Sequence, residues 1–191
     1  LESYQTLGST TPVGRDNSLE DMPSFEATLT RSESLFDHLL GQLTVLELNE
    51  AELRVGHEIL GNLDDSGYLK LEGIEGDPVI HLAHACDVPV ELAERILKTI
   101  QGFDPLGVGA RDLQECLLIQ ARHLPKDAAL VGTIVKHHLK HLETNNIPAI
   151  AREMKLPQAD IARAVALISK LEPRPARNFI TEEPRYITPD I

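Results

Sequence analysis

Hydrophobic side chains recur at helical spacing through most of the chain after residue 31. A first helix is predicted to begin at Ser32 or Ser34 and to carry one apolar stripe, formed by Leu35, Leu39, Leu43 and Leu46. Asn49 and Glu52 have the spacing of a capping box, which opens a second helix. The apolar positions of that helix are Leu53, Ile59, Leu60 and Leu63. The dominant period near 3.6 residues predicts an all-α fold without a sheet of consequence.

Turn-forming residues interrupt this pattern at three places. Residues 64–67, Asp-Asp-Ser-Gly, end the second helix, and we expect residues 68–71 to be briefly extended. Residues 103–109 hold one proline and two glycines and form a rigid elbow rather than helix. Prolines beyond Leu171 predict an extended, Pro-rich C-terminal tail, which includes residues 186–191.

Two stretches of the chain match each other without gaps at an offset of 68 residues, namely 78–105 and 146–173. Val88-Pro89 aligns with Leu156-Pro157, and Asp104-Pro105 aligns with Glu172-Pro173. Each copy reads as a short helix, a tight turn ending in proline and a longer helix, which is the outline of a helix-turn-helix unit. Two copies are too few for a solenoid, so we interpret them as related helical units.

The elbow leads into an amphipathic helix predicted over Ala110–Leu124, and another is predicted over Lys126–Leu142. We therefore expect two small helical subdomains, residues 32–124 and 125–191, each with one helix-turn-helix-like unit. Residues 1–31 are rich in Ser, Thr, Gly, Pro and acidic residues, and we expect an acidic flexible linker there. The chain starts at Leu1 and stops where an extended segment starts, which we interpret as a fragment of a longer protein.

The elbow has two interpretations. It is a structural hinge if Asp104-Pro105 ends one helix, the glycines permit unusual φ angles and Arg111 binds nearby carbonyl groups. It is also a candidate protein-binding loop, because we expect such an elbow to expose Leu106 and Val108.

Composition and charge limit the classes of function that this chain can have. The 191 residues are 42% hydrophobic and only 4% aromatic, and their net charge is −12. Residues 1–50 hold two arginines against nine carboxylates, a net charge of −7. An acidic chain is a poor sole ligand of the DNA backbone. The absence of a 20-residue apolar run and of a secretory leader predicts a cytoplasmic protein without membrane contact, and Cys86 and Cys116 are expected to be reduced core thiols.

The sequence predicts no catalytic residue, cofactor, small-molecule ligand or metal. Residues 62–69 resemble the start of a calcium loop, but Gly73 stands at the twelfth position, where a bidentate Glu belongs, so we expect a turn. His137 and His141 have the i, i+4 spacing of zinc ligands, and His138 lies in the apolar stripe. No partner ligand is visible by spacing, and we expect core or boundary histidines; His81, His84 and Cys86 form a weaker version of this pattern.

A rival hypothesis is a duplicated helix-turn-helix DNA-binding regulator. Its recognition helices would lie at 90–100 and 158–170, of which the first is charge-balanced and the second only slightly basic. The basic cluster of the chain lies after the second unit and is a candidate for proximity to nucleic acid: Lys170, Arg174, Arg177 and Arg185.

Three blocks, in order, resemble the core-binding region of sigma-54, the enhancer-dependent bacterial sigma factor. They are Asn-Leu-Asp-Asp-Ser-Gly-Tyr-Leu at 62–69, Phe-Asp-Pro-Leu-Gly-Val-Gly-Ala-Arg-Asp-Leu at 103–113 and Leu-Glu-Pro-Arg-Pro at 171–175. The pattern Ser34-Leu35…His38-Leu39…Gln42-Leu43 is similar to the stretch that precedes that region. The resemblance covers about residues 25–191, and its middle block is highly specific.

The resemblance implies a protein-interaction module that binds bacterial core RNA polymerase through its beta and beta-prime subunits. It implies promoter DNA as a partner only of the full-length factor in the holoenzyme, and an activator ATPase that acts on a region outside this sequence. The expected partner-binding residues lie in the first half, in the turn and the elbow: Asp64, Asp65, Gly67, Tyr68, Phe103, Asp104, Pro105, Leu106, Gly107, Val108, Gly109 and Arg111.

Overall fold

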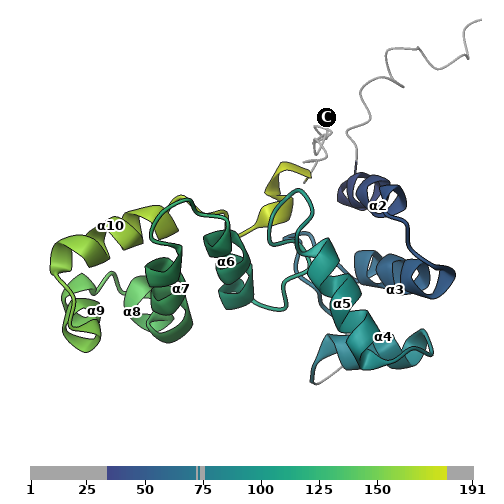
Figure 1. Ribbon diagram of the computed structural model, residues 1–191, viewed down its shortest axis with the longest axis horizontal. Coiled ribbons are helices and arrows are strands. Elements are labelled where there is room, and N and C mark those ends of the chain that lie inside the picture. The colour runs from purple at the N-terminus through teal and green to yellow at the C-terminus, as the bar shows by residue number, and fades with distance from the viewer. Residues whose placement is uncertain (1–33, 72, 74–75, 180–191) are drawn as a thin grey trace, which may run out of the picture. The chain divides into compact units, whose positions relative to one another are not determined.

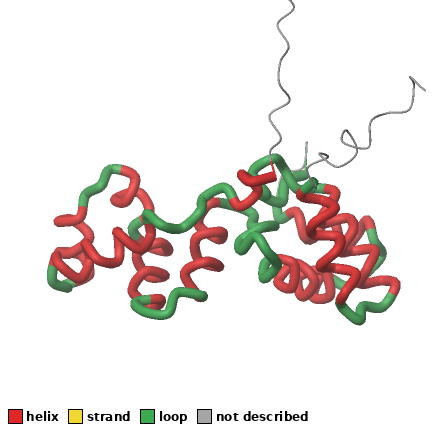
Figure 2. Tube along the Cα trace, turned by 90° about the horizontal axis from the view of Figure 1, so that it is seen from above, coloured by secondary structure: helices red, strands yellow, loops and turns green. Residues whose placement is uncertain are grey.

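The computed structural model describes residues 34–71, 73 and 76–179. The predicted linker at 1–31, the tail at 186–191 and Arg185 lie outside these residues. The described residues form nine α-helices and one 3-10 helix (Figure 1), and Figure 2 shows only helix and loop along this part of the trace. The elements are α2 (Leu35–Val45), α3 (Glu50–Gly61), α4 (Pro78–Ala85), α5 (Val90–Ile100), α6 (Leu113–Arg122), α7 (Ala128–His137), α8 (Leu139–Glu143), α9 (Ile147–Met154), α10 (Gln158–Ile168) and η1 (Pro175–Phe179). The all-α prediction is confirmed.

Local capping explains where the first helices begin. The Ser34 side chain accepts a hydrogen bond from the backbone N–H of Asp37 at 3.1 Å, so Ser34 is the cap of α2. Asn49 and Glu52 form the predicted capping box, with contacts of 2.9 and 3.0 Å. Each bond satisfies a backbone N–H that has no partner within the first helical turn.

Two predicted helices have different bounds in the structure. The helix expected from Ala110 begins at Leu113, because the Asp112 carboxylate caps it through the N–H of Glu115 at 2.7 Å. The single helix expected over Lys126–Leu142 is two helices, α7 and α8. Asp127 has a left-handed φ of 58° and precedes α7, and His138, with φ −124°, separates α7 from α8.

The two matching stretches have the same helix count, order and lengths. Helices α4 and α9 each have eight residues, and α5 and α10 each have eleven. In both turns a residue of positive φ, Asp87 or Lys155, lies two positions before the proline that precedes the long helix. Their helix-turn-helix-like character stays a prediction, because these observations establish only the order of helices and the turn.

Hydrophobic side chains gather in two main cores. The first joins α2, α3, α4 and α5 with the elbow, through residues such as Leu43, Ile59 and Ile100. The second joins α6, α7, α9 and α10, through residues such as Leu117 and Ile134, and Figure 1 shows α6 beside α7. The division of the chain at residue 124 stays a prediction, and α6 packs in the second of the two cores. In the part of the chain that the structure describes, every helix lacks the length and apolar character of a membrane span.

Leu117→Ala is expected to lower the free energy of unfolding by about 2–5 kcal/mol, because Leu117 is 6% exposed in the second core. Leu139→Ala is expected to cost less, because Leu139 is only half-buried against the same core. Denaturant midpoints of the two variants measure the difference. A larger shift for Leu139→Ala would contradict this assignment of the core.

Candidate functional site

The turn at Asp64–Tyr68 is organised around one carboxylate. Oδ1 of Asp64 accepts hydrogen bonds from the backbone N–H groups of Ser66 and Tyr68, both at 2.9 Å, and Oδ2 lies 2.8 Å from Nζ of Lys70. Both carboxylate oxygens of Asp64, which a calcium loop would use to bind the ion, therefore already bind groups of the protein. Partial burial alone would raise the pKa of Asp64, but the bonds from Lys70 and Tyr68 outweigh it and hold the pKa below its ordinary value.

The backbone of this turn pairs with the backbone of the elbow. The N–H of Gly109 donates to the carbonyl of Gly67 at 2.8 Å, and the N–H of Leu69 donates to the carbonyl of Ala110 at 2.9 Å. These bonds join segments that are about forty residues apart in the sequence, so the first two resemblance blocks form one structural unit.

The third resemblance block closes over the same turn. The Tyr68 hydroxyl donates to the carbonyl of Pro173, and the N–H of Ala176 donates to the carbonyl of Ser66 at 3.3 Å. Gly67 has a φ of +89°, and a Cβ atom there would lie 3.1 Å from Cγ of Pro175. Burial raises the pKa of Tyr68 to about 12, so its hydroxyl stays a proton donor at neutral pH. We call the assembly of residues 64–69, 103–111 and 171–176 the junction.

The Gln120 side chain, on α6, connects the elbow to the third block, residues 171–175. Its Nε2 donates to the carbonyls of Glu172 at 2.7 Å and Leu106 at 3.2 Å, and its Oε1 accepts from the N–H of Glu172 at 2.9 Å. Gln120 is 9% exposed, and the neighbouring Cys116 is fully buried, which raises the pKa of its thiol to about 11. Both predicted core cysteines are buried and free of disulfides.

Helix α2 holds the outer side of the elbow. Gln42 donates to the carbonyl of Asp104 at 2.7 Å and accepts from its N–H at 2.9 Å. The His38 imidazole lies 3.7 Å from the Asp104 carboxylate. The Asp104–Pro105 peptide bond is cis. Two residues of the α2 pattern that resembles the family therefore contact the elbow directly.

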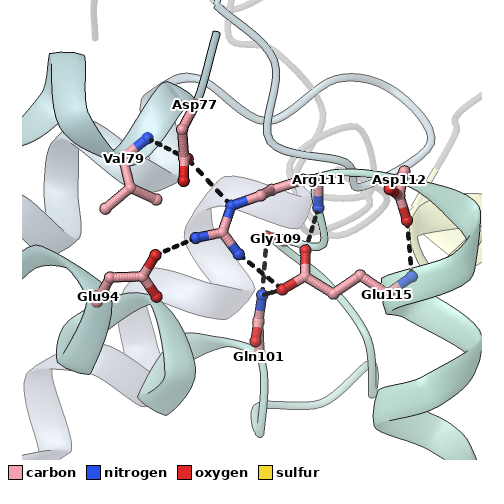
Figure 3. A network of polar contacts seen from close by, with 8 residues as sticks. All are labelled: Asp77, Val79, Glu94, Gln101, Gly109, Arg111, Asp112 and Glu115. Atoms are coloured by element: carbon pink, nitrogen blue, oxygen red, sulfur yellow. Dashed lines mark hydrogen bonds and ion pairs between the residues drawn. The ribbon is translucent and has the colours of Figure 1, made fainter.

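Arg111 lies at the centre of a network of carboxylates (Figure 3). Its Nε lies 3.1 Å from Asp77, Nη1 lies 2.8 Å from Glu115 and Nη2 pairs with Glu94. Glu115 also accepts from the backbone N–H of Arg111 at 2.7 Å and from Gln101 at 3.0 Å. The expectation that Arg111 binds carbonyl groups is wrong, because three carboxylates surround the guanidinium.

This network binds the start of α4 and the middle of α5 to the entry of α6. Partial burial opposes the charge on Arg111, but Glu115, Asp77 and Glu94 outweigh it and raise the pKa of Arg111 above its ordinary value. Arg111 is therefore held in place by internal ion pairs, and its role in partner binding stays a prediction.

The structure divides the predicted partner-binding residues into two groups. Five of them are buried inside the junction: Gly67, Phe103, Gly107, Val108 and Gly109. The expectation that the elbow exposes Val108 is wrong, since this side chain is 0% exposed and packs in the first core. Asp65 and Asp104 are exposed, and the others are half-buried: Asp64, Tyr68, Pro105, Leu106 and Arg111.

An open groove lies beside the junction, between α2, the end of α3 and η1. Its lining includes Phe36, Leu63, Asp65 and Phe179. Phe36 is 41% exposed, so an aromatic ring stands at the surface next to an acidic turn residue. Phe36 was not among the predicted partner-binding residues, although an aromatic side chain outside the leucine stripe of α2 was a signal in the sequence.

The proximity of the basic cluster to nucleic acid stays a prediction. Lys170, Arg174 and Arg177 are exposed, and Arg185 lies outside the described residues. Gln101, Glu115 and Gln120 were missed as organisers of the junction. The i, i+4 spacing of Arg111 and Glu115 was a local signal for one ion pair, but nothing local indicated the contacts of Gln120 with Glu172.

Asp64→Asn is expected to lower the stability at neutral pH and to flatten its dependence on acid pH. Because the folded-state pKa of Asp64 is depressed, its carboxylate stabilises the fold above the unfolded-state pKa. That contribution is lost as the pH falls through the lower, folded-state value. Urea midpoints of both chains between neutral and strongly acid pH measure this, and equal slopes for the two chains would contradict it.

The fold and the junction define an all-helical module with no strand of appreciable length in the part of the chain that the structure describes. Its sequence matches the family of the Sigma-54 factor, core binding domain, over residues 24–191. The chain belongs to this family, which consists of transcription initiation factors rather than enzymes.

Three relatives illustrate the similarity. The chain is 35% identical over 176 residues to the RNA polymerase sigma-54 factor of Acidithiobacillus ferridurans, with 90% of the chain and 36% of the relative covered. It is 31% identical over 191 residues to that of Pseudomonas aeruginosa, covering 98% and 37%. It is 30% identical over 193 residues to that of Salmonella typhimurium, covering 100% and 39%. The chain thus spans less than half of the length of these relatives.

Proposed function

We propose that this chain is the module of a sigma-54-type transcription initiation factor that binds core RNA polymerase. The match to the core binding domain over residues 24–191 carries this proposal. In the whole factor, other regions read the promoter and respond to the activator ATPase, and the partners of this chain are the beta and beta-prime subunits of the polymerase.

The contact lies mainly in the first half of the chain, at the rim of the junction and the adjacent groove. Phe36 and Leu106 offer apolar surface there, and Asp65 and Asp104 offer charge. The buried bonds beneath them hold this rim in a fixed conformation, which reduces the entropy lost on binding. The five buried residues of the predicted set act as the support of this surface, not as contacts.

A duplicated helix-turn-helix DNA binder is less well supported. Arg95 on α5 pairs with Glu52 at 2.5 Å, and Arg163 on α10 pairs with Asp160 at 2.7 Å. Arginines that already face carboxylates are poorly placed to displace counterions from DNA. In the assembled complex, Lys170, Arg174 and Arg177 are the residues placed nearest to nucleic acid.

Binding of the full chain to core polymerase and to DNA separates the two functions. The chain carries a fluorescent label, and its anisotropy is titrated with core polymerase, with arbitrary duplex DNA, and with both. We expect saturable binding to polymerase and none to duplex alone at moderate salt. Binding to duplex alone, without binding to polymerase, would replace the proposal with the DNA-binding hypothesis.

A further inference from the structure

Two histidines and one glutamate meet between α8 and α9. His138 precedes α8, His141 lies within α8, and Glu153 lies one residue before the end of α9. Nδ1 of His138 lies 2.9 Å from Oε2 of Glu153, and Nε2 of His141 lies 3.3 Å from Oε1. Among the described residues these three form a group in which one ligand atom from each lies within 4.8 Å of the others.

One ring nitrogen of His138 is buried and faces the Glu153 carboxylate. This nitrogen, Nδ1, is inaccessible to solvent. The Glu153 carboxylate lies close by but forms no directed hydrogen bond with this nitrogen. A buried nitrogen without a directed partner is costly, whereas a cation along its lone pair would satisfy it. The His141 ring is stacked on the His138 ring, with their planes 26° apart, and its nitrogen faces the other oxygen of the same carboxylate.

The separations fit a transition-metal ion. A tetrahedral Zn²⁺ with ligands at about 2.0–2.1 Å holds adjacent ligand atoms about 3.3 Å apart. The two nitrogen–oxygen contacts, 2.9 and 3.3 Å, run to different oxygens of the Glu153 carboxylate and are comparable to this edge length, and one ligand atom from each of the three residues lies within 4.8 Å of the others. Imidazole nitrogens select zinc and its neighbours over Mg²⁺ and Ca²⁺, which prefer oxygen ligands.

We propose that His138, His141 and Glu153 bind one divalent transition-metal ion, Zn²⁺ in preference to Mg²⁺ or Ca²⁺, with water in the fourth position. The Glu153 side chain is 52% exposed, so the site is open to solvent on one side. The ion ties the five-residue helix α8, which has no buried residue, to α9. Its effect is to stabilise the second half of the chain, because an ion that binds only the folded state adds to its stability.

This site differs from the pair that the sequence spacing indicated. His137 ends α7 and is exposed, and the third ligand, Glu153, is twelve residues beyond His141. The expectation of no metal rested on the lack of a visible partner ligand in the sequence. The fold supplies that partner, because α9 packs against α8.

The test is a titration of the full chain with Zn²⁺ in the presence of a non-thiol reductant. Calorimetry gives the affinity and the stoichiometry, Co²⁺ absorption in the visible range reports tetrahedral coordination, and thermal unfolding reports stabilisation. We expect one ion per chain and a higher Tm with Zn²⁺ but not with Mg²⁺. His141→Ala and Glu153→Gln are each expected to weaken binding at least about ten-fold and to remove the shift in Tm.

His137→Ala and Glu143→Gln are matched controls on the neighbouring exposed positions, and both are expected to bind like the parent. Glu153→Gln nearly preserves shape, and far-ultraviolet circular dichroism verifies that it folds. No binding by the parent at micromolar Zn²⁺ would overturn the proposal. The three side chains would then form only the ion pairs between the histidines and Glu153. Unchanged binding by both ligand variants, or its loss in His84→Ala instead, would also overturn it.

Discussion

Gly107→Ala is expected to destabilise the protein by about 2–5 kcal/mol, because overpacking and a left-handed backbone add at one site. Gly107 has a φ of +91°, which residues with a side chain rarely adopt. A Cβ atom there would lie 2.8 Å from Sγ of Cys116 and 3.1 Å from Nε2 of Gln120. The elbow would have to move away from α6, and the bond between Gln120 and Leu106 would be lost.

Gly41→Ala is the matched control for this change. Gly41 lies within α2, and a Cβ atom there would have no heavy atom within 4 Å. Because alanine favours helix over glycine, this variant is expected to be neutral or more stable by about 0.5–1 kcal/mol. Urea unfolding of both variants gives the comparison, and equal midpoints would show that the elbow tolerates side chains at residue 107.

Phe36→Ala is expected to weaken the binding of core RNA polymerase at least about ten-fold while leaving stability nearly unchanged. Partly exposed aromatic residues that insert into a partner are the side chains whose truncation costs most at interfaces. Phe36 is 41% exposed beside the junction, and it is not a member of the buried first core. The dissociation constant is measured by anisotropy with the full chain.

Leu156→Ala tests the assignment of the contact to the first half. Leu156 is 38% exposed in the turn before α10, so it matches Phe36 in exposure but not in location. We expect Leu156→Ala to bind polymerase like the parent. If only Leu156→Ala binds polymerase more weakly, the contact lies in the second half instead. If both variants bind more weakly, the contact surface spans both halves.

Several elements of the fold were predictable because they depend on neighbours in the sequence. The leucine stripe of α2, the capping box of Asn49 and Glu52 and the two matching helix pairs arise from contacts within one or two helical turns. The same kind of signal placed the helix breaks near Pro89 and Pro157. Where local signals competed, as at residues 110–113, the predicted bounds were less accurate.

Which residues of the elbow face solvent was not predictable in the same way. Glycines and a proline indicated a rigid loop, and the sequence alone permitted Val108 to be outside or inside. The backbone bond from Gly109 to Gly67 and the packing of α5 decide that Val108 lies in the core. Burial of a loop residue depends on what covers it, and here the covering segment comes from forty residues away.

Local sequence patterns predicted most of the helices, the repeat and the three blocks that relate the chain to its family, and the composition gave the acidic charge. Three other features emerge from the folded chain alone: these blocks form one junction, Arg111 pairs with carboxylates, and Glu153 meets His138 and His141. The reason is physical: periodicity and capping are interactions between near neighbours along the chain. The junction and the histidine site instead depend on long-range packing, in which the position of each helix is fixed by all the others.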